Sequence, residues 1–193
     1  MSKVKVGIIG ATGYVGVELI RLLNSHPQVE LTAIGSNSFV DKSITEVYPS
    51  VGITNDMKCI KNEDVIKECD FIFTALPHGV SEEFVLQAVK EGKKVVDLGA
   101  DFRLKDEKLF NKWYNVSFID KNLHEQAVYG LCEHYKDEIK NAQVIANPGC
   151  YVTSISLPLM PLLKAKLIKK ENIIADSKSG VTGAGRGLTL LRH

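Results

Sequence analysis

A glycine-rich loop near the N-terminus, between a strand pattern and a helix pattern, most constrains how this chain can fold. Residues 3–9 alternate and are rich in Val and Ile, which predicts a buried strand, and apolar residues at helical spacing follow the loop. The loop itself reads Gly10-Ala11-Thr12-Gly13-Tyr14-Val15-Gly16. This order of elements is typical of dinucleotide-binding domains, and a glycine-rich turn without a ligand is the alternative.

Each glycine of this loop has its own physical purpose in such a domain. Gly10 permits a tight turn, and Gly13 lets the backbone approach a pyrophosphate that the helix N-terminus then holds. Gly16 allows the helix to pack closely on the strand. We therefore expect the loop to bind a cofactor through Gly10, Thr12, Gly13, Tyr14 and Val15.

Strand and helix patterns alternate through roughly the first three quarters of the chain. Strand patterns cover residues 30–35, 57–60, 70–76, 94–98 and 144–146, and helix patterns cover 62–69, 81–91 and 105–114. This alternation predicts an α/β fold with a doubly wound parallel sheet, which is a Rossmann-type NADP-binding domain. We assign this domain to residues 1–148 and the start of an α+β substrate or dimerisation domain to residues 149–193.

Some local expectations are weaker than this overall pattern. Asn62 is expected to cap its helix, and Trp113 is expected to pack inward. The helix after residue 150 is expected to be interrupted at Pro158 and to end near residue 167, before a strand at 172–176. Residues 39–56 have no clear period.

Composition excludes several classes of protein. The 193 residues are 45% hydrophobic and carry a net charge of +1 that is spread evenly, which does not favour nucleic acid or an anionic membrane as partner. The N-terminus lacks an apolar signal region, and the longest apolar stretch, residues 155–163, is too short to span a bilayer. The four cysteines indicate neither a disulfide framework nor a metal site. We therefore expect a cytoplasmic protein without a metal.

The end of the second strand bears on the choice of cofactor. Folds that prefer NAD place an Asp or Glu there to accept hydrogen bonds from the ribose 2′-hydroxyl. Here the sequence has no carboxylate at this point, and Ser36 and Ser38 can donate to a 2′-phosphate. We expect NADP for this reason, although the loop contains no Arg. Leu76 and Pro77, at the end of another strand, are expected to lie over the cofactor.

Cys150 stands at a strand-to-helix turn, where amide N–H groups and the helix dipole favour a reactive thiolate. A cysteine without further context is more often a small buried apolar residue. The pair Asp101-x-Arg103, at the end of strand 94–98, also has two interpretations, either a surface salt bridge or a ligand site.

Several motifs occur in order and together resemble one family. They are Gly10-x-x-Gly13-x-x-Gly16, Leu76-Pro77-His78-Gly79, Asp97-Leu98-Gly99-Ala100-Asp101-Phe102-Arg103, Tyr129-Gly130-Leu131, Asn147-Pro148-Gly149-Cys150-Tyr151 and Ser179-Gly180-x-x-Gly183-Ala184-Gly185-Arg186. With this set the chain resembles the N-acetyl-gamma-glutamyl-phosphate reductases of arginine biosynthesis, in the semialdehyde dehydrogenase family, over nearly its whole length.

The resemblance implies an activity and roles for particular residues. The activity is NADPH-dependent reductive dephosphorylation of an acyl phosphate, N-acetyl-glutamyl phosphate, to N-acetyl-glutamate semialdehyde. By resemblance, Cys150 forms the thioester, and Arg103 and Asn147 bind the substrate. The second glycine loop, with Ser179, Gly180 and Gly183, is implied to lie at the nicotinamide end of NADP. The full-length protein is implied to be a homo-oligomer.

Two features depart from the family pattern. Cys132 stands where family members usually have another residue. The family's general acid/base histidine lies in a His-Arg-His-type segment beyond the second glycine loop, and no histidine here matches it; the histidines are His26, His78, His124, His134 and His193. We therefore expect a truncated chain that binds NADP weakly and turns over substrate poorly or not at all.

Two other functions remain as alternatives. The chain fits a non-catalytic NADP-binding or regulatory module, for which the N-terminal loop alone is sufficient. It also fits a related aspartate-semialdehyde-type dehydrogenase, which shares that loop and a catalytic cysteine but resembles this sequence less around Cys150.

Overall fold

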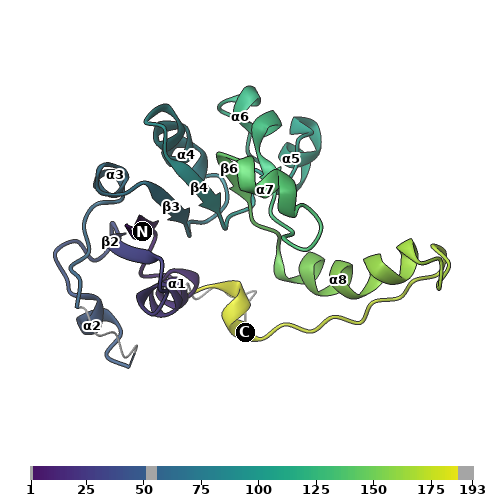
Figure 1. The fold of residues 1–193 in the computed structure, drawn as a ribbon, viewed down its shortest axis with the longest axis horizontal. Coiled ribbons are helices and arrows are strands. Elements are labelled where there is room, and N and C mark those ends of the chain that lie inside the picture. Colours follow the sequence, from purple (N-terminus) through teal and green to yellow (C-terminus); the bar gives the residue numbers. More distant parts are fainter. Residues whose placement is uncertain (1, 51–55, 187–193) are drawn as a thin grey trace.

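The structure is a computed structural model that describes residues 2–50 and 56–186. In this part of the chain, six strands form one sheet in the order β2-β1-β3-β4-β6-β5, and every neighbouring pair is parallel (Figure 1). The predicted doubly wound parallel sheet is thereby confirmed. The strands are β1 (Val4–Ile9), β2 (Val29–Gly35), β3 (Phe71–Thr74), β4 (Lys94–Asp97), β5 (Val128–Tyr129) and β6 (Val144–Ala146).

Helices cover both faces of the sheet because successive side chains of each strand point to opposite sides. Ile8 and Ile34 pack with Ile20 of α1 on one face. Ile9 and Ile72 belong to a second core on the other face, with residues of α3, α4 and α6. The helices up to residue 141 are α1 (Tyr14–Asn24), α2 (Ile44–Val47), α3 (Asn62–Val65, continued by the 3-10 turn η1, Ile66–Glu68), α4 (Ser81–Lys90), α5 (Glu107–Tyr114), α6 (Lys121–Gln126) and α7 (Lys136–Asn141).

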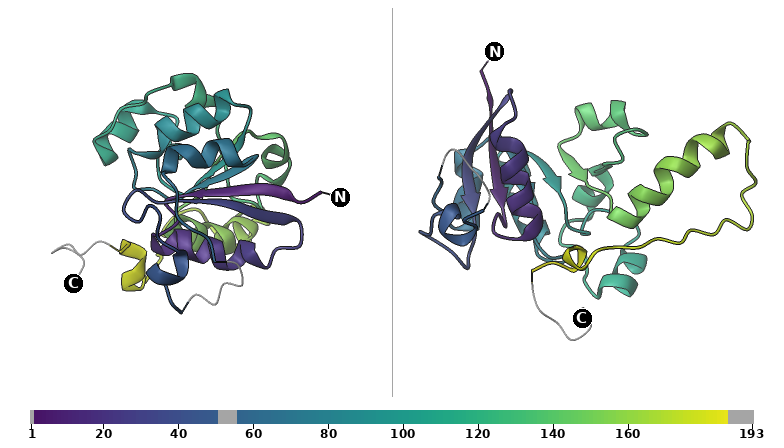
Figure 2. Two further views of the ribbon diagram at one scale, coloured as in Figure 1. Left: turned by 90° about the vertical axis from the view of Figure 1, so that its left-hand side faces the viewer. Right: turned by 90° about the horizontal axis from the view of Figure 1, so that it is seen from below.

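The long helix α8 (Cys150–Lys164) projects away from the sheet (Figure 1). It is continuous through Pro158 and Pro161, so the expected interruption is wrong, and it ends slightly before the expected place. Residues 165–180 then return along an extended path to a second 3-10 turn, η2 (Val181–Ala184), beside α1 (Figure 2). The described residues after Gly149, 150–186, therefore start and finish near the same edge of the sheet.

Three further local predictions are wrong, each because a tertiary partner decides the outcome. Residues 172–176 form no strand, and all five are exposed, with no neighbouring strand among the described residues to pair with. Trp113 is 70% exposed on the outer face of α5 instead of packing inward. Asn62 does not cap α3; Lys61 occupies that position, and the Asn62 side chain accepts a hydrogen bond from Gly10 N.

Two segments that the sequence described poorly have a defined shape in their described residues, 39–50 and 56–60, while residues 51–55 lie outside the described part of the chain. Residues 57–60 make isolated bridges, Gly35 with Ile60 and Ser43 with Lys58, instead of the expected short strand. The segment without a clear period contains α2, which begins with a capping box in which Ser43 and Glu46 satisfy each other's backbone amides. The capping box fixes this excursion beside the first glycine loop, where Tyr48 donates a hydrogen bond to Thr12 O.

The packing of Gly16 predicts the effect of a single added methyl group on stability. A Cβ at Gly16 would meet backbone atoms, Gly10 O at 2.5 Å and the Ala11 Cα at 2.6 Å, so the helix would have to move away from the loop. We expect Gly16→Ala to lower the free energy of unfolding by about 1–3 kcal/mol in urea denaturation. Gly13→Ala is the matched control, because a Cβ there meets only Gly10 O at 3.6 Å. An equal loss in both variants would contradict this account.

Candidate functional site

The candidate site residues gather at one edge of the sheet because all strands are parallel and their carboxyl ends meet there. β1 leads into the first glycine loop, β2 into Ser36, and β3 into Leu76. β4 leads toward Arg103, and β6 leads through a short turn to Cys150. Segments far apart in sequence therefore form one continuous edge, with a nucleotide-sized cavity at one end and a cysteine at the other.

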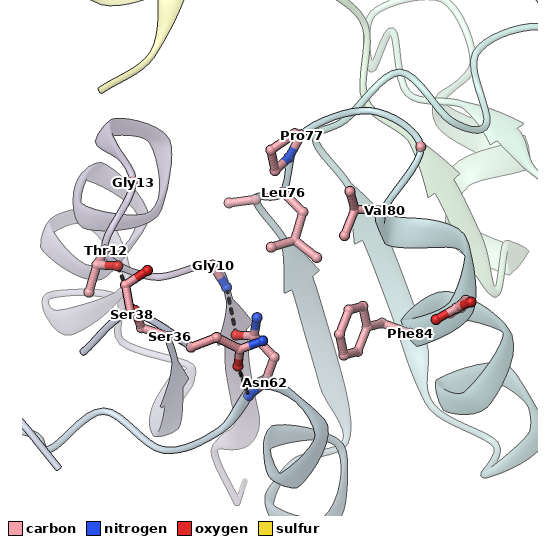
Figure 3. A pocket seen from close by; sticks show the side chains of 14 residues that line it. Gly10, Thr12, Gly13, Ser36, Ser38, Asn62, Leu76, Pro77, Val80 and Phe84 are labelled. Carbon is pink, nitrogen blue, oxygen red and sulfur yellow. Dashed lines mark hydrogen bonds between the residues drawn. The ribbon is translucent and has the colours of Figure 1, made fainter. Parts of the chain in front are cut away.

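The cavity lies between the first glycine loop, the end of β3 and the start of α4, and has a volume of about 560 Å³ (Figure 3). The structure brings together there seven of the residues predicted to bind a cofactor, namely Gly10, Thr12, Gly13, Ser36, Ser38, Leu76 and Pro77. The cavity wall also contains Gly79, from the Pro77-His78-Gly79 loop expected over the cofactor, and residues that sequence reasoning missed, namely Asn37, Asn62, Ala75, Val80, Glu83 and Phe84. The 81–91 helix pattern was the available signal for Phe84, whose apolar ring faces the cavity in Figure 3.

The glycine loop has the geometry that close approach of a pyrophosphate requires. Gly10 has φ +80, and a Cβ there would meet Ala75 O at 2.5 Å, so only glycine fits without strain. Gly13 lines the cavity and is the N-cap of α1, where the helix offers unpaired amides. A Cβ on Gly13 would meet Gly10 O at 3.6 Å and, among the described residues beyond its chain neighbours, no other atom within 4 Å, so it would occupy part of the space that a ligand can enter. The residues present therefore fit a dinucleotide phosphate at this place.

Asn62, at the start of α3, holds the first glycine loop through a hydrogen bond to its first residue, Gly10. It is buried, and its Oδ1 accepts a hydrogen bond from Gly10 N at 3.3 Å, while its own backbone amide donates to Asn37 Oδ1 at 3.2 Å (Figure 3). Through its side chain and its backbone amide, Asn62 thus ties the end of β1 to the loop after β2. Because the two hydrogen-bonded residues are 52 positions apart, no local sequence signal could have revealed the contact.

The loop after β2 forms the polar wall of the cavity. The hydroxyls of Thr12 and Ser36 are 2.7 Å apart and both residues are buried, whereas Ser38 is exposed at the rim. Glu83, on the opposite wall in α4, is the acidic residue of the lining. The wall around the serines therefore offers hydroxyl groups without a carboxylate that would repel a phosphate.

Asp101 and Arg103 do not pair with each other but hold two different structures. Asp101 is 1% exposed, and its carboxylate accepts from Gly79 N at 2.6 Å and from Ser81 N at 3.0 Å. It therefore fixes the loop before α4 and satisfies amides at the start of that helix. The salt-bridge interpretation of the Asp-x-Arg pair is wrong.

Arg103 joins the end of β4 to the turn that precedes Cys150. Its Nε donates to Asn147 O at 2.8 Å and its Nη2 donates to Leu98 O at 3.0 Å. Its Nη1 lies 3.3 Å from the position that a Cβ on Gly149 would occupy. The guanidinium is therefore anchored by two carbonyls and directed at the start of α8.

Cys150 is the first residue of α8, is exposed, and follows Gly149 as N-cap. Asn147 donates its backbone amide to Asp97 O at 2.8 Å, and its side chain donates to Pro148 O at 3.1 Å, which holds the turn rigidly against β4. Asp97 itself is fully buried, and burial raises the pKa of its carboxyl, which accepts a hydrogen bond from Thr74 Oγ1 at 2.6 Å. An exposed thiol on a firmly held turn can attack a bound electrophile.

The second glycine loop lies beside α1, where Gly183 lines a cavity with residues of that helix. Tyr14, Val15 and Gly183 line a second cavity of about 390 Å³ together with Leu98, whose carbonyl holds Arg103. Ser179 and Gly180 are exposed and line neither cavity. The structure thus brings part of the second loop close to the first and leaves its beginning outside.

His124 and His78 lie in other surroundings than Cys150, one in the core and one in an exposed loop. His124 is fully buried, stacks on Phe118 with ring centroids 3.4 Å apart, and its Nε2 lies 3.0 Å from Glu82 Oε1. His78 is exposed in the loop after β3 and lies beside Tyr114. His193 lies outside the described residues. Within residues 2–50 and 56–186, no group of three or more His, Cys, Asp or Glu side chains could hold a metal ion.

No helix in the part of the chain that the structure describes is long and apolar enough to cross a membrane.

Comparisons with known proteins add to this geometry. Residues 5–142 match the family model described as semialdehyde dehydrogenase, NAD binding domain, and residues 150–193 match the semialdehyde dehydrogenase dimerisation domain. N-acetyl-gamma-glutamyl-phosphate reductase from Clostridium beijerinckii is 55% identical over 190 residues, which are 98% of this chain and 55% of that protein. The reductase of that name from Pelotomaculum thermopropionicum is 49% identical over 192 residues, again 98% of this chain and 55% of the relative. The chain spans about half the length of the curated relatives it matches.

Solved structures show the same fold at low identity. Aspartate semialdehyde dehydrogenase II from Vibrio cholerae, complexed with ASA, has a TM-score of 0.63 and 19% identity, and the match covers 86% of this chain and 44% of that chain. The enzyme from Candida albicans with NADP has a TM-score of 0.59 and 22% identity, covering 85% of this chain and 48% of that chain. At these identities the likeness concerns the fold alone.

Removal of the Asp101 carboxylate should weaken the loop before α4. We expect Asp101→Ala to lower the free energy of unfolding by about 1.5–3 kcal/mol in urea denaturation, because two amides lose a charged acceptor. Asp106→Ala is the matched control, since Asp106 caps α5 through one amide at an exposed position and should cost about 1 kcal/mol. Equal small losses would show that Asp101 does not hold the loop.

The four cysteines should differ sharply in their reaction with iodoacetamide. Burial raises the pKa of the Cys69 thiol to about 11 and also raises that of Cys59, so both hold little thiolate at pH 8. We expect Cys150 to be labelled fastest, ahead of exposed Cys132, as measured by peptide mapping of the folded protein. The urea-unfolded chain, labelled at all four positions, is the control. Equal labelling in the folded state would contradict a special role for Cys150.

Proposed function

The chain belongs to the semialdehyde dehydrogenase family, and from this membership we propose that it acts in an NADPH-dependent reductase of arginine biosynthesis. The proposed reaction converts N-acetyl-glutamyl phosphate into N-acetyl-glutamate semialdehyde. The names of the relatives that match 98% of the chain favour this substrate. The observation that carries the proposal is the exposed Cys150 at the start of α8, beside anchored Arg103 and at the same sheet edge as the cavity of the first glycine loop.

The first chemical step is acyl transfer to Cys150. The thiolate attacks the carbonyl carbon of the acyl phosphate, the C–S bond forms, and the C–O bond to phosphate breaks with release of inorganic phosphate. A thiolate suits this step because it is a strong nucleophile and later a good leaving group. The amides at the N-terminus of α8 favour negative charge at this position.

Arg103 and Asn147 are the proposed substrate-binding residues. The Arg103 guanidinium has five N–H donors, and hydrogen bonds to Asn147 O and Leu98 O occupy one on Nε and one on Nη2. Nη1, directed at Gly149, is suited to a carboxylate or phosphate oxygen beside the thiol. In this proposal the fixed turn around Asn147 orients the acyl carbonyl for attack.

The proposed cofactor site extends along the same edge. Gly10, Gly13 and Thr12 hold the pyrophosphate, Ser36 and Ser38 bind the adenosine end, and Leu76 and Pro77 cover it. Tyr14, Val15 and the second glycine loop, with Ser179, Gly180 and Gly183, are proposed for the nicotinamide end. When bound, NADPH supplies the hydride that reduces the thioester to the aldehyde and frees the thiolate.

We also propose a homo-oligomer for the whole protein. The support is the match of residues 150–193 to a dimerisation domain and the apolar exposure of α8, where Tyr151 is 46% and Val152 is 49% exposed. In this proposal the nucleotide-binding domain comprises residues 1–148, and residues 149–193 begin the dimerisation domain.

Formation of a thioester tests the proposal directly. Intact-mass spectrometry of the full chain, mixed with N-acetyl-glutamyl phosphate without NADPH, should show an acyl adduct that hydroxylamine removes. Cys150→Ala should lose the adduct, and Cys132→Ser, which removes the other exposed thiol, should keep it. This experiment needs no general acid/base, because phosphate leaves without a proton.

Other outcomes separate the alternatives. An adduct that persists in Cys150→Ala would remove the nucleophile from the proposal. A preference for aspartyl phosphate over N-acetyl-glutamyl phosphate would favour an aspartate-semialdehyde-type dehydrogenase. The absence of any adduct, with NADPH binding intact, would favour the non-catalytic NADP-binding module.

A further inference from the structure

Arg186 reaches back from the second glycine loop to the rim of the nucleotide cavity. Its Nη1 donates to Thr12 O at 3.2 Å, although the two residues are 174 positions apart. Its guanidinium carbon lies 5.3 Å from the ring centroid of Phe39 and 5.1 Å from that of Tyr48. Tyr48 donates to the same carbonyl oxygen of Thr12 at 2.9 Å, so this oxygen accepts hydrogen bonds from both Tyr48 and Arg186.

These contacts orient the guanidinium without neutralising its charge. Aromatic faces and a carbonyl oxygen attract a cation but carry no net charge. Among the described residues, no carboxylate forms an ion pair with Arg186. Only one of its five N–H donors has a hydrogen-bond partner in that part of the chain, so the others are available to a ligand.

Arg186 lies close to the loop after β2, residues 36–38, which has no cation to bind a phosphate. Thr12, which Arg186 contacts, shares a hydrogen bond with Ser36, and Phe39, which lies beside the guanidinium, is the neighbour of Ser38 in the chain. This is the end of β2, where dinucleotide-binding folds discriminate the ribose 2′-hydroxyl from a 2′-phosphate. The loop there contains hydroxyls and no cation of its own.

We propose that Arg186 recognises the 2′-phosphate of NADP, supplying from the second glycine loop the cation that the loop after β2 lacks. The guanidinium fork suits a phosphate, and Ser36 and Ser38 complete the hydrogen bonding. This inference rests on the proposed function in its choice of NADP, but not on the thioester chemistry. It makes Arg186 a specificity residue of the adenosine end, whereas the resemblance implies the nicotinamide end for the whole loop, residues 179–186.

Lys61 is the rival cation for this role. It precedes Asn62 of the cavity wall and follows Ile60, whose carbonyl accepts a hydrogen bond from Ser36 N at 2.9 Å. Its side chain is exposed, and within the described part of the chain the cation over the rings of Phe39 and Tyr48 is that of Arg186, not of Lys61. A direct comparison of the two cations is therefore part of the test.

The test compares two nucleotides that differ only by the phosphate in question. Isothermal titration of the full chain gives dissociation constants for 2′,5′-ADP and for 5′-AMP. We expect Arg186→Ala to weaken 2′,5′-ADP by about tenfold or more and to leave 5′-AMP within about twofold, because only the first ligand has a 2′-phosphate. Arg186→Lys should keep part of the preference, and higher salt should reduce it in the wild type.

Control variants and contrary outcomes are well defined. Arg21→Ala removes another exposed arginine, one that pairs with Glu18 on α1, and should change neither affinity. Equal weakening of both nucleotides by Arg186→Ala would show that the residue only supports the loop, and a selective loss in Lys61→Ala instead would transfer the role to Lys61. Either result overturns the inference. If 2′,5′-ADP binds as expected but no acyl adduct forms on Cys150, the inference stands while the proposed reductase function fails.

Discussion

The common direction of the six described strands is the constraint on which the rest of this structure depends. A parallel sheet brings every carboxyl end to one edge and every connection back across a face, so loops far apart in sequence become neighbours. β1 lies inside the sheet, between β2 and β3, so its glycine loop stands between the β2 and β3 loops that line the cavity. The helices on the two faces stabilise the sheet, and the order of the strands determines which loops, and therefore which side chains, are neighbours at this edge.

The loops at this edge are fixed by buried or half-buried polar side chains that bond to backbone groups of other loops. Asn62 holds Gly10, Asp101 holds the loop before α4, and Arg103 holds the turn before Cys150. Each of these contacts satisfies backbone groups that would otherwise be costly to bury. A rigid frame of this kind keeps the exposed thiol of Cys150 and the first glycine loop in fixed positions at the edge of the sheet.

Much of the fold, and part of the cavity lining, could be predicted from periodicity and turn chemistry. β1, β2, β3, β4 and β6 were recognisable because buried parallel strands are apolar runs, whereas the two-residue strand β5 (Val128–Tyr129) was not predicted. Gly10 was recognisable because its turn requires positive φ. Trp113 and residues 172–176 were misjudged because apolar or β-branched composition does not say whether a partner surface exists. Asn62 and Asp101 were misjudged because each bonds to a distant backbone amide instead of a neighbour in sequence.

The path of the chain after Cys150 connects the two ends of the edge. α8 carries the thiol at its first residue, and the segment that leaves this helix returns to place Gly183 beside Tyr14 and Arg186 against Thr12 (Figure 2). A ligand that binds Arg186 therefore also restrains the segment that begins at Cys150. In the proposed arrangement NADP would contact Arg186 and the acyl group would contact Cys150, so both ligands would bind one continuous segment of the chain.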